Sequence, residues 1–240
     1  LTLLAENYYQ NNNYKKTESI LNSFNENDDI YYWYKIKKRA SIISNELGTQ
    51  DSLNFINSKF KKIKNPSLNI LFDMANITKG LEEYETSIVY YNKVLSKISL
   101  NSEARAEILY RRGSCYERLK QFEKSDKDLL NSLEINPNDA YVLNYLAYSW
   151  LERNYKIDTS ITMLEKACKQ KKNNPYILDS VGWAYYLVGD LIKAEQFLRK
   201  SIKIMPDDPI VNDHYGDILW AMNRKTQAKY YWQSVLNFEN

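Results

Sequence analysis

The side chain best suited to acid–base chemistry in this sequence is His214, the only histidine among the 240 residues. Asp213 precedes it directly, and Asp213 and Asp217 share a helix face because they lie four residues apart. A histidine close to carboxylates can accept or donate a proton near neutral pH. One histidine excludes a histidine-rich metal site, and the three residues also suit a polar patch on a helix surface. We predict the polar patch and no catalytic residue.

The two cysteines, Cys115 and Cys168, lack the close pairing that indicates a cysteine-based zinc site. Each falls in a helical pattern, so we predict two small buried side chains; a disulfide or a reactive thiol is the alternative. The phosphate-binding patterns GxxxxGK(S/T) and GxGxxG are both absent. The sequence therefore predicts no metal, no cofactor and no enzymatic activity.

Composition favours a folded helical protein with short connections. Hydrophobic residues make up 44% of the chain and charged residues 26%, with only six glycines and five prolines. The net charge of +3 is too small to require a nucleic-acid or membrane partner. No apolar run approaches the ~18 residues that a membrane span needs. Because the chain opens at Leu1, without Met and inside an apolar helical pattern, we expect upstream sequence that could hold a signal peptide or lipid anchor.

A repeat in the C-terminal part reveals the elements that would position these residues. Gly182 and Gly216 are 34 residues apart, and so are Ala194 and Ala228. A fixed period of this length is typical of stacked helix–turn–helix units. Within a unit, apolar residues recur at i, i+3, i+4 and i+7, as on one face of a helix.

The repeated positions have physical roles. Gly182 and Ala194 are small, so the two helices of a unit can approach closely, whereas Tyr185 and Leu198 are large and fill the space between units. Gly189 suits the left-handed or turn geometry between the helices. One helix pair cannot bury both of its faces, so neighbouring pairs must stack to form the core.

This pattern resembles the tetratricopeptide repeat (TPR) family over most of the chain. The resemblance implies an all-α fold, a right-handed α-solenoid of stacked helix–turn–helix units in a single array of about seven repeats. The expected repeats cover residues 1–27 (partial), 28–67, 68–105, 106–139, 140–174, 175–208 and 209–240. No obvious polar capping helix follows the seventh repeat. Its last helix is either polar outside or open to a partner, including a second copy of the chain.

The second repeat departs most from the pattern. We expect helices over residues 30–45 and 49–64, broken at Gly48, with Asp51 and Ser52 near the start of the second helix, where polar caps belong. Its basic residues are predicted to form a solvated face, with an acidic partner as the alternative. These residues are Lys35, Lys37, Lys38, Arg39, Lys59, Lys61, Lys62 and Lys64.

In the TPR family, the first helix of each repeat lines a concave groove that takes peptide ligands. Carried over position by position, the resemblance implies a groove rich in Tyr and Trp, with Asp and Asn between them. Flat rigid rings supply contact area at small entropic cost and keep one polar edge, which suits an extended or helical polypeptide. The alternative is that several rings belong to the core between helices. The implied groove residues are Tyr110, Arg111, Tyr141, Asn144, Tyr145, Tyr148, Tyr176, Asp179, Trp183, Tyr186, Asp213, His214, Asp217 and Trp220.

One TPR subclass holds a C-terminal carboxylate with a Lys/Asn/Asn/Lys/Arg clamp, and this sequence does not support that clamp. Phe72 and Tyr110 occupy the starting positions in the third and fourth repeats, and Asn76 and Arg111 are isolated matches.

A narrower resemblance covers the last two repeats. The runs ILDSVGWAYYLVGD (177–190) and HYGDILWAMNR (214–224), followed by Trp232, are similar to the end of a group of Gram-negative TPR lipoproteins. Members of that group sit on the periplasmic side of the outer membrane, and at least one is an adaptor that activates a carboxyl-terminal processing protease and delivers its substrates. The resemblance implies a periplasmic or outer-membrane-anchored protein, with a cytoplasmic location as the alternative.

We therefore predict a non-enzymatic scaffold that binds a protein or peptide in the groove. A helical-repeat RNA-binding protein is the first alternative. Asp179, Asp213 and Asp217 oppose it, because a groove that follows phosphates should be basic. The second alternative is a substrate-recruiting TPR arm of a larger enzyme whose catalytic domain lies upstream.

Overall fold

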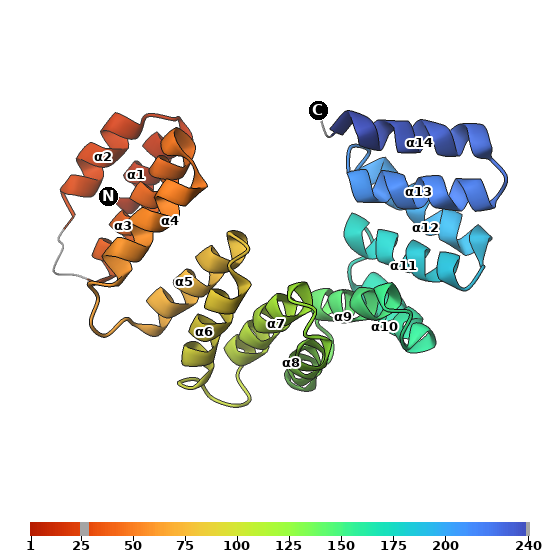
Figure 1. Ribbon diagram of the computed structural model, residues 1–240, viewed down its shortest axis with the longest axis horizontal. Coiled ribbons are helices and arrows are strands. Elements are labelled where there is room, and N and C mark those ends of the chain that lie inside the picture. Colours follow the sequence, from red (N-terminus) through yellow and green to blue (C-terminus); the bar gives the residue numbers. More distant parts are fainter. Residues whose placement is uncertain (25–28, 239–240) are drawn as a thin grey trace. The chain divides into compact units, whose positions relative to one another are not determined.

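The computed structural model describes residues 1–24 and 29–238, and within these ranges it contains fourteen α-helices and no strand. Successive helices form antiparallel hairpins (Figure 1). The chain divides into two compact units, unit 1 (residues 1–97) and unit 2 (residues 98–240). The prediction of an all-helical fold is confirmed over the described ranges.

Unit 1 holds three hairpins and unit 2 holds four, counted over the described residues. In unit 1 the helices are α1 (Thr2–Gln10), α2 (Tyr14–Asn22), α3 (Asp29–Leu47), α4 (Thr49–Phe60), α5 (Leu68–Gly80) and α6 (Tyr84–Leu95). In unit 2 they are α7 (Glu103–Arg118), α8 (Phe122–Ile135), α9 (Ala140–Glu152), α10 (Ile157–Gln170), α11 (Pro175–Leu187), α12 (Leu191–Ile204), α13 (Pro209–Ala221) and α14 (Lys225–Phe238).

Local sequence explains where the helices of unit 2 begin. The side chains of Asp139, Asn174 and Asp208 accept hydrogen bonds from the first backbone N–H groups of α9, α11 and α13. Pro175 and Pro209 follow two of these caps, where a missing N–H is not needed. The same kind of cap therefore fixes the start of three successive first helices, so that each begins at the equivalent position of its repeat.

The turn inside each hairpin uses a residue with positive φ. Gly189 has φ +80°, as its place in the repeat predicts, and Gly48 has φ +103°. The other five hairpins place a non-glycine residue in this left-handed geometry, at φ between 52° and 61°. These residues are Asn12, Glu82, Lys120, Asn154 and Asn223.

The small positions permit close helix packing in unit 2. A Cβ atom at Gly182 would lie 1.8 Å from Leu198 Cδ2 and 3.1 Å from the carbonyl oxygen of Ala194. A Cβ atom at Gly216 would meet the Trp232 indole at 2.4 Å. The predicted role of Gly182 is confirmed, and Leu198 is fully buried in the core that joins α9 to α14.

Two predictions for the second hairpin, formed by α3 and α4, are wrong. Helix α4 ends at Phe60 and not at residue 64. Ser52 does not cap the helix, because its hydroxyl donates to the carbonyl oxygen of Ala40 at 2.7 Å. Ser87 bonds the carbonyl oxygen of Ala75 at the same distance, so a serine at this position ties the two helices of a hairpin together.

The prediction of a solvated basic face is wrong for Lys35 of α3, and three further basic residues of this helix are paired with carboxylates. Lys35 is 4% exposed. Lys37 pairs with Asp73 at 2.7 Å, Lys38 with Glu6 at 2.7 Å and Arg39 with Glu18 at 2.8 Å. Acidic residues on α1, α2 and α5 thus neutralise basic residues of α3. The periodicity of one helix could not reveal these partners, because they lie on other helices. Lys61, Lys62 and Lys64 are exposed, as expected.

The two cysteines differ in burial. Cys115 is fully buried, as predicted, whereas Cys168 is only partly buried, and both thiols are free. Ala167 takes the core position of α10, and the next residue on a helix points about 100° away from it. Burial raises the pKa of the Cys168 thiol, and Glu165 raises it further while Lys200 opposes the shift.

Two surveys of the described residues bear on function. Nowhere in residues 1–24 and 29–238 do three or more His, Cys, Asp or Glu side chains gather to hold a metal ion. Among the helices that the structure describes, none has both the length and the hydrophobicity required to cross a bilayer.

Candidate functional site

A cleft of about 430 Å³ lies in unit 2, where the first helices of four successive hairpins, α7, α9, α11 and α13, turn the same face outward. We call it the main cleft. It combines tyrosine rings with carboxylates, amides and hydroxyls. Its lining residues are Glu117, Arg118, Asn144, Tyr145, Tyr148, Ser149, Glu152, Tyr176, Asp179, Ser180, Asp208, Ile210 and Val211.

Two tyrosines of α9 are held in place by glutamates. The Tyr145 hydroxyl donates to Glu117 Oε2 at 3.0 Å, which links α9 to α7. Burial raises the pKa of Tyr145, and the neighbouring Glu117 raises it further. Burial likewise raises the pKa of Tyr148, with additional contributions from Glu152 and Asp179. Both phenols therefore stay neutral at physiological pH, and their rings have fixed positions in the wall of the cleft.

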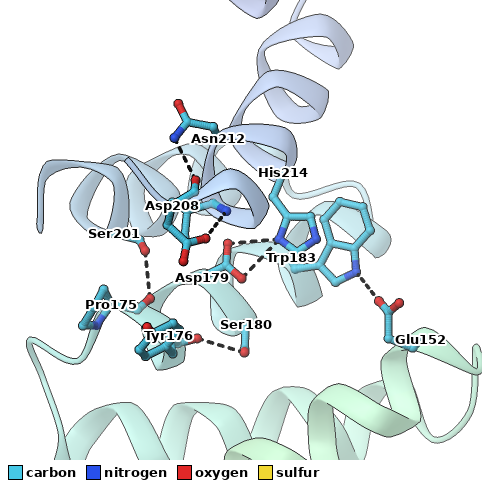
Figure 2. Close-up of polar contacts among 11 residues, drawn as sticks. Glu152, Pro175, Tyr176, Asp179, Ser180, Trp183, Ser201, Asp208, Asn212 and His214 are labelled. Atoms are coloured by element: carbon cyan, nitrogen blue, oxygen red, sulfur yellow. Dashed lines mark hydrogen bonds and ion pairs between the residues drawn. The ribbon is translucent and has the colours of Figure 1, made fainter. Parts of the chain in front are cut away.

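Figure 2 shows the polar network at one end of the main cleft. Asp179 of α11 faces His214 of α13, with its two carboxylate oxygens 3.0 and 3.1 Å from Nδ1. The Trp183 ring stacks on the imidazole at a centroid distance of 4.2 Å and an interplanar angle of 15°. The indole Nε1–H of Trp183 donates to Glu152 at 3.1 Å. Three consecutive hairpins are thus connected by one chain of polar and stacking contacts.

This geometry corrects the prediction for His214. The side chain is 7% exposed, and its ion-pair partner is Asp179, 35 residues earlier in the chain, and not Asp213 or Asp217. Burial by itself lowers the pKa of His214, but the hydrogen bond and charge of Asp179, helped by Asp213 and Glu152, outweigh it. The pKa of His214 therefore lies above its ordinary value. His214 is a buried structural link and not part of a surface patch.

A second cleft of about 420 Å³ lies along α7 and α9. It contains the predicted residues Tyr110, Arg111 and Tyr141, together with acidic side chains. Arg111 pairs with Glu107 on the next turn of the same helix at 2.8 Å. The rings of Tyr110 and Tyr145 meet edge to face at a centroid distance of 5.7 Å, and each ring lines one cleft. The second cleft therefore adjoins the main cleft across this ring pair.

The two clefts bring together eight of the fourteen residues implied by the TPR resemblance. Tyr176 and Tyr141 are the most accessible of them, at 58% and 50% exposed. The remaining residues lie on α11 and α13 outside the cleft linings. Trp183 and Tyr186 stack on each other, Trp220 is 43% exposed beside Trp232, and Asp213, His214 and Asp217 complete the set.

Sequence reasoning missed several lining residues. Glu152 ends α9, one residue beyond the last groove position that the repeat assigns, and Ser149 and Asp208 also fall between assigned positions. Glu117 likewise lies in the last turn of its helix, one residue before the end of α7. A search for carboxylates in the final turn of each first helix would have found both glutamates.

The isolated clamp matches have other roles. Asn76 accepts a hydrogen bond from the Tyr91 hydroxyl at 2.7 Å, inside the hairpin of α5 and α6. Arg111 pairs with Glu107, as described above.

Comparisons with known proteins show what this chain is similar to. Residues 106–139 match the tetratricopeptide repeat family model. The TPR repeat-containing protein PA4667 of Pseudomonas aeruginosa is 32% identical over 110 residues, which cover 46% of this chain and 18% of that protein. The BBSome complex member BBS4 of Bos taurus is 28% identical over 134 residues, or 53% of this chain and 25% of that protein. The chain thus spans a quarter or less of the length of these curated relatives.

Solved structures share the fold at low sequence identity. A tetratricopeptide repeat protein from Parabacteroides merdae superposes with a TM-score of 0.63 at 17% identity, covering 85% of this chain and 79% of the other. PilF of Pseudomonas aeruginosa superposes with a TM-score of 0.62 at 15% identity, covering 71% of this chain and 76% of PilF. MamA from Desulfovibrio magneticus superposes with a TM-score of 0.59 at 15% identity, covering 74% of this chain and 97% of the MamA chain. Residues 106–139 thus match one tetratricopeptide repeat, and the chain shares the helical-hairpin fold of these solved structures.

Proposed function

We propose that the face formed by α7, α9, α11 and α13 binds an extended segment of a partner protein, and that the chain acts as an adaptor without catalytic activity. The observation that carries the proposal is the main cleft of about 430 Å³, which four successive first helices line together. A groove that runs across several repeats can contact a segment of several residues at once.

The chemistry of the lining suits a polypeptide. Tyr145, Tyr148 and Tyr176 offer ring faces with one polar edge, a combination that is enriched at binding surfaces. Asn144 and Ser180 add polar groups of the kind that pair with a peptide backbone. Because the helices that carry these residues are locked by the core of unit 2, little order has to be gained on binding.

The finer proposal is a periplasmic adaptor that serves a processing protease. It is supported by the resemblance of residues 177–190 and 214–224 to Gram-negative TPR lipoproteins. Protease protection in spheroplasts of the native host tests the compartment. Digestion of the protein by protease added outside the spheroplasts is the expected result, and protection until the inner membrane is lysed would contradict it.

Site-specific photo-crosslinking in the native host tests the groove. A photoreactive amino acid at Tyr176, on the cleft face, is expected to capture a discrete partner. The matched control is Ile192 on the second helix α12, which is 67% exposed against 58% for Tyr176. Introducing Tyr148→Ala should weaken the capture at residue 176, provided that circular dichroism shows an unchanged helix content.

Two results would contradict this binding face. One is the same set of cross-links from residues 176 and 192. The other is cross-linking at residue 176 that Tyr148→Ala leaves unchanged. Capture of a second copy of the chain would identify the partner segment as its own.

A further inference from the structure

We propose that this face selects a positively charged segment, which places one Lys or Arg side chain in the main cleft and another in the second cleft, on either side of the Tyr110–Tyr145 ring pair. The inference rests on the proposed function and specifies the chemistry of the partner. It is argued from charge, ring geometry and unsatisfied polar atoms in unit 2.

The charged residues that line the main cleft are mostly acidic. Helices α7, α9 and α11 and the N-cap of α13 each contribute a carboxylate to the lining, and Arg118 is the only basic residue among the described lining residues. Asp179 is already paired with His214, and Asp208 caps α13 through the N–H of Val211. The two glutamates, one at the end of α7 and one at the end of α9, are the carboxylates left to face a ligand.

Aromatic side chains orient both glutamates. Glu117 accepts from the Tyr145 hydroxyl and Glu152 accepts from the Trp183 indole. A carboxylate has two oxygens and about four lone-pair sites, so each group retains capacity for a further donor. An ammonium or guanidinium group placed against either carboxylate would form charge-assisted hydrogen bonds, which are about twice as strong as neutral ones.

The ring faces point to the same ligand. Tyr145, Tyr148 and Tyr176 line the same cleft as the carboxylates. A cation within about 6 Å of an aromatic centroid is attracted by the negative face of the ring. The aliphatic stem of Lys or Arg can at the same time cover the apolar surface beside these rings.

Unsatisfied polar atoms in the same wall indicate a missing hydrogen-bonding partner. Ser149 is 6% exposed and lines the cleft, yet its hydroxyl has no hydrogen-bond partner among the described residues. Asn144 also lines the cleft, and its Oδ1 is shielded from solvent and has no partner in the described part of the chain. An amide oxygen is only an acceptor, so the ligand that satisfies it must bring a donor. Lys and Arg side chains bring three and five donors, respectively.

The second cleft repeats this chemistry. Glu103, Glu107 and Asp139 line it together with Tyr110 and Tyr141, and Arg111 pairs with Glu107. Burial raises the pKa of Tyr110, and the charge of Asp139 adds to the rise. Because the Tyr110 and Tyr145 rings touch, an extended segment that crosses this ring pair can reach both clefts.

Peptide binding measured by fluorescence anisotropy with the full chain tests the proposal. The probes are three short fluorescein-labelled Gly-Ser peptides that differ at two positions, which carry lysine, the neutral isostere norleucine or glutamate. The lysine peptide is expected to bind at least roughly tenfold more tightly than the norleucine peptide, and the glutamate peptide is expected to bind most weakly. Added salt should weaken the binding of the lysine peptide, because opposite charges attract less when they are screened.

A matched pair of double variants tests the assignment to the cleft. Glu117→Gln with Glu152→Gln removes two charges and keeps an acceptor for Tyr145 and Trp183. Glu123→Gln with Glu134→Gln removes the same charge from exposed positions on the second helix α8. The cleft variant should lose the preference for lysine over norleucine, whereas the control should keep it. Equal losses in the two variants would show only a long-range effect of net charge and would overturn the assignment.

The outcomes separate this inference from the proposed function. Equal binding of the lysine and norleucine peptides, or no binding of the lysine peptide at about 1 mM, would overturn the charge preference. Photo-crosslinking at Tyr176 does not depend on these peptides, so a captured segment without Lys or Arg would leave the groove assignment standing and refute the cationic partner.

Discussion

The two units use the same helical hairpin but place their charged residues differently. In unit 1, the basic residues of α3 pair with acidic residues on neighbouring helices: Lys37 with Asp73, Lys38 with Glu6 and Arg39 with Glu18. Unit 2 also pairs charges between helices, as Arg112 with Asp128 at 2.6 Å, but further carboxylates at the ends of α7 and α9 line an open cleft. Charges that are paired internally stabilise a fold, whereas charges that line a cleft are available to a ligand.

Aromatic residues follow the same division. In unit 1, Trp33 is 3% exposed and meets Phe60 edge to face, and Phe60 meets Tyr90 in the same way. In unit 2, Tyr141 and Tyr176 are half exposed at the clefts. Unit 2 also buries aromatic residues, such as Trp150 and Tyr215, so the difference lies in the half-exposed rings at its clefts, where the proposed binding function falls.

The largest expected effect tests whether the units are energetically separate. Leu198→Ala removes a fully buried side chain from the core of unit 2 and should cost about 2–5 kcal/mol of unfolding free energy. Hydrogen–deuterium exchange is expected to show lost protection in residues 98–240 and little change in residues 1–97. Leu187→Ala, at a position 40% exposed, is the control. Equal loss of protection in both units would contradict the division.

A glycine comparison sharpens the difference in packing. Gly182→Ala in unit 2 should cost about 1–3 kcal/mol, because the new methyl group would overlap Leu198 and approach the Ala194 carbonyl oxygen. Gly80→Ala in unit 1 meets no atom within 4 Å and should be neutral or slightly stabilising. Urea unfolding measures both. A Gly182→Ala protein as stable as the Gly80→Ala protein would show that the hairpin can absorb the methyl group.

A smaller, pH-dependent effect is expected in unit 2 alone, since the single histidine lies there. The pKa of His214 is raised in the folded state, so its protonation stabilises the fold fully below the unfolded value of 6.5, and that stabilisation is lost as pH rises through the folded pKa. The groups facing it are Asp179, Asp213, Asp217 and Glu152.

Urea unfolding at about pH 6 and about pH 8, followed by tryptophan fluorescence, measures this dependence. Trp33 is the one tryptophan of unit 1, so the signal reports mainly on unit 2. The wild type should lose stability between the two pH values, and His214→Gln should reduce that loss. Identical pH dependence in the two proteins would contradict the role of His214.

The smallest expected effect lies in unit 1. Lys38→Gln breaks the ion pair with Glu6 and removes an ammonium group 4.2 Å from the Tyr9 ring centroid. The Glu6 side chain is 40% exposed, so solvent screens the pair and the cost should be only about 0.2–1 kcal/mol. The difference from wild type should shrink at high salt. A cost that is independent of salt would mean that packing of the lysine stem matters more than its charge.

Much of the fold could be predicted because it depends on local repetition. The 34-residue spacing of Gly182 and Gly216 indicates the hairpin, and the structure shows why each must be small. The helices of the irregular second repeat were also expected, with the break at Gly48, but α4 ends earlier than the pattern implied.

The candidate site could be predicted only in part. Position in the repeat places Tyr145, Tyr148 and Tyr176 on first helices, and they line the main cleft. It could not place Glu152, which lies just beyond the assigned positions, nor separate the ring of Trp183, which stacks on His214, from rings that face the cleft. Which side of a first helix is covered depends on how neighbouring hairpins stack.

The sequence alone determined that this chain forms helical hairpins, because the period, the caps and the small residues act within one repeat. Only the tertiary structure decided which charged residues are paired and which are available. The partner of His214 is 35 residues earlier, in the preceding hairpin, and the partner of Lys37 is 36 residues later. Such pairs depend on distances between separate helices, and no pattern along a single helix encodes those distances.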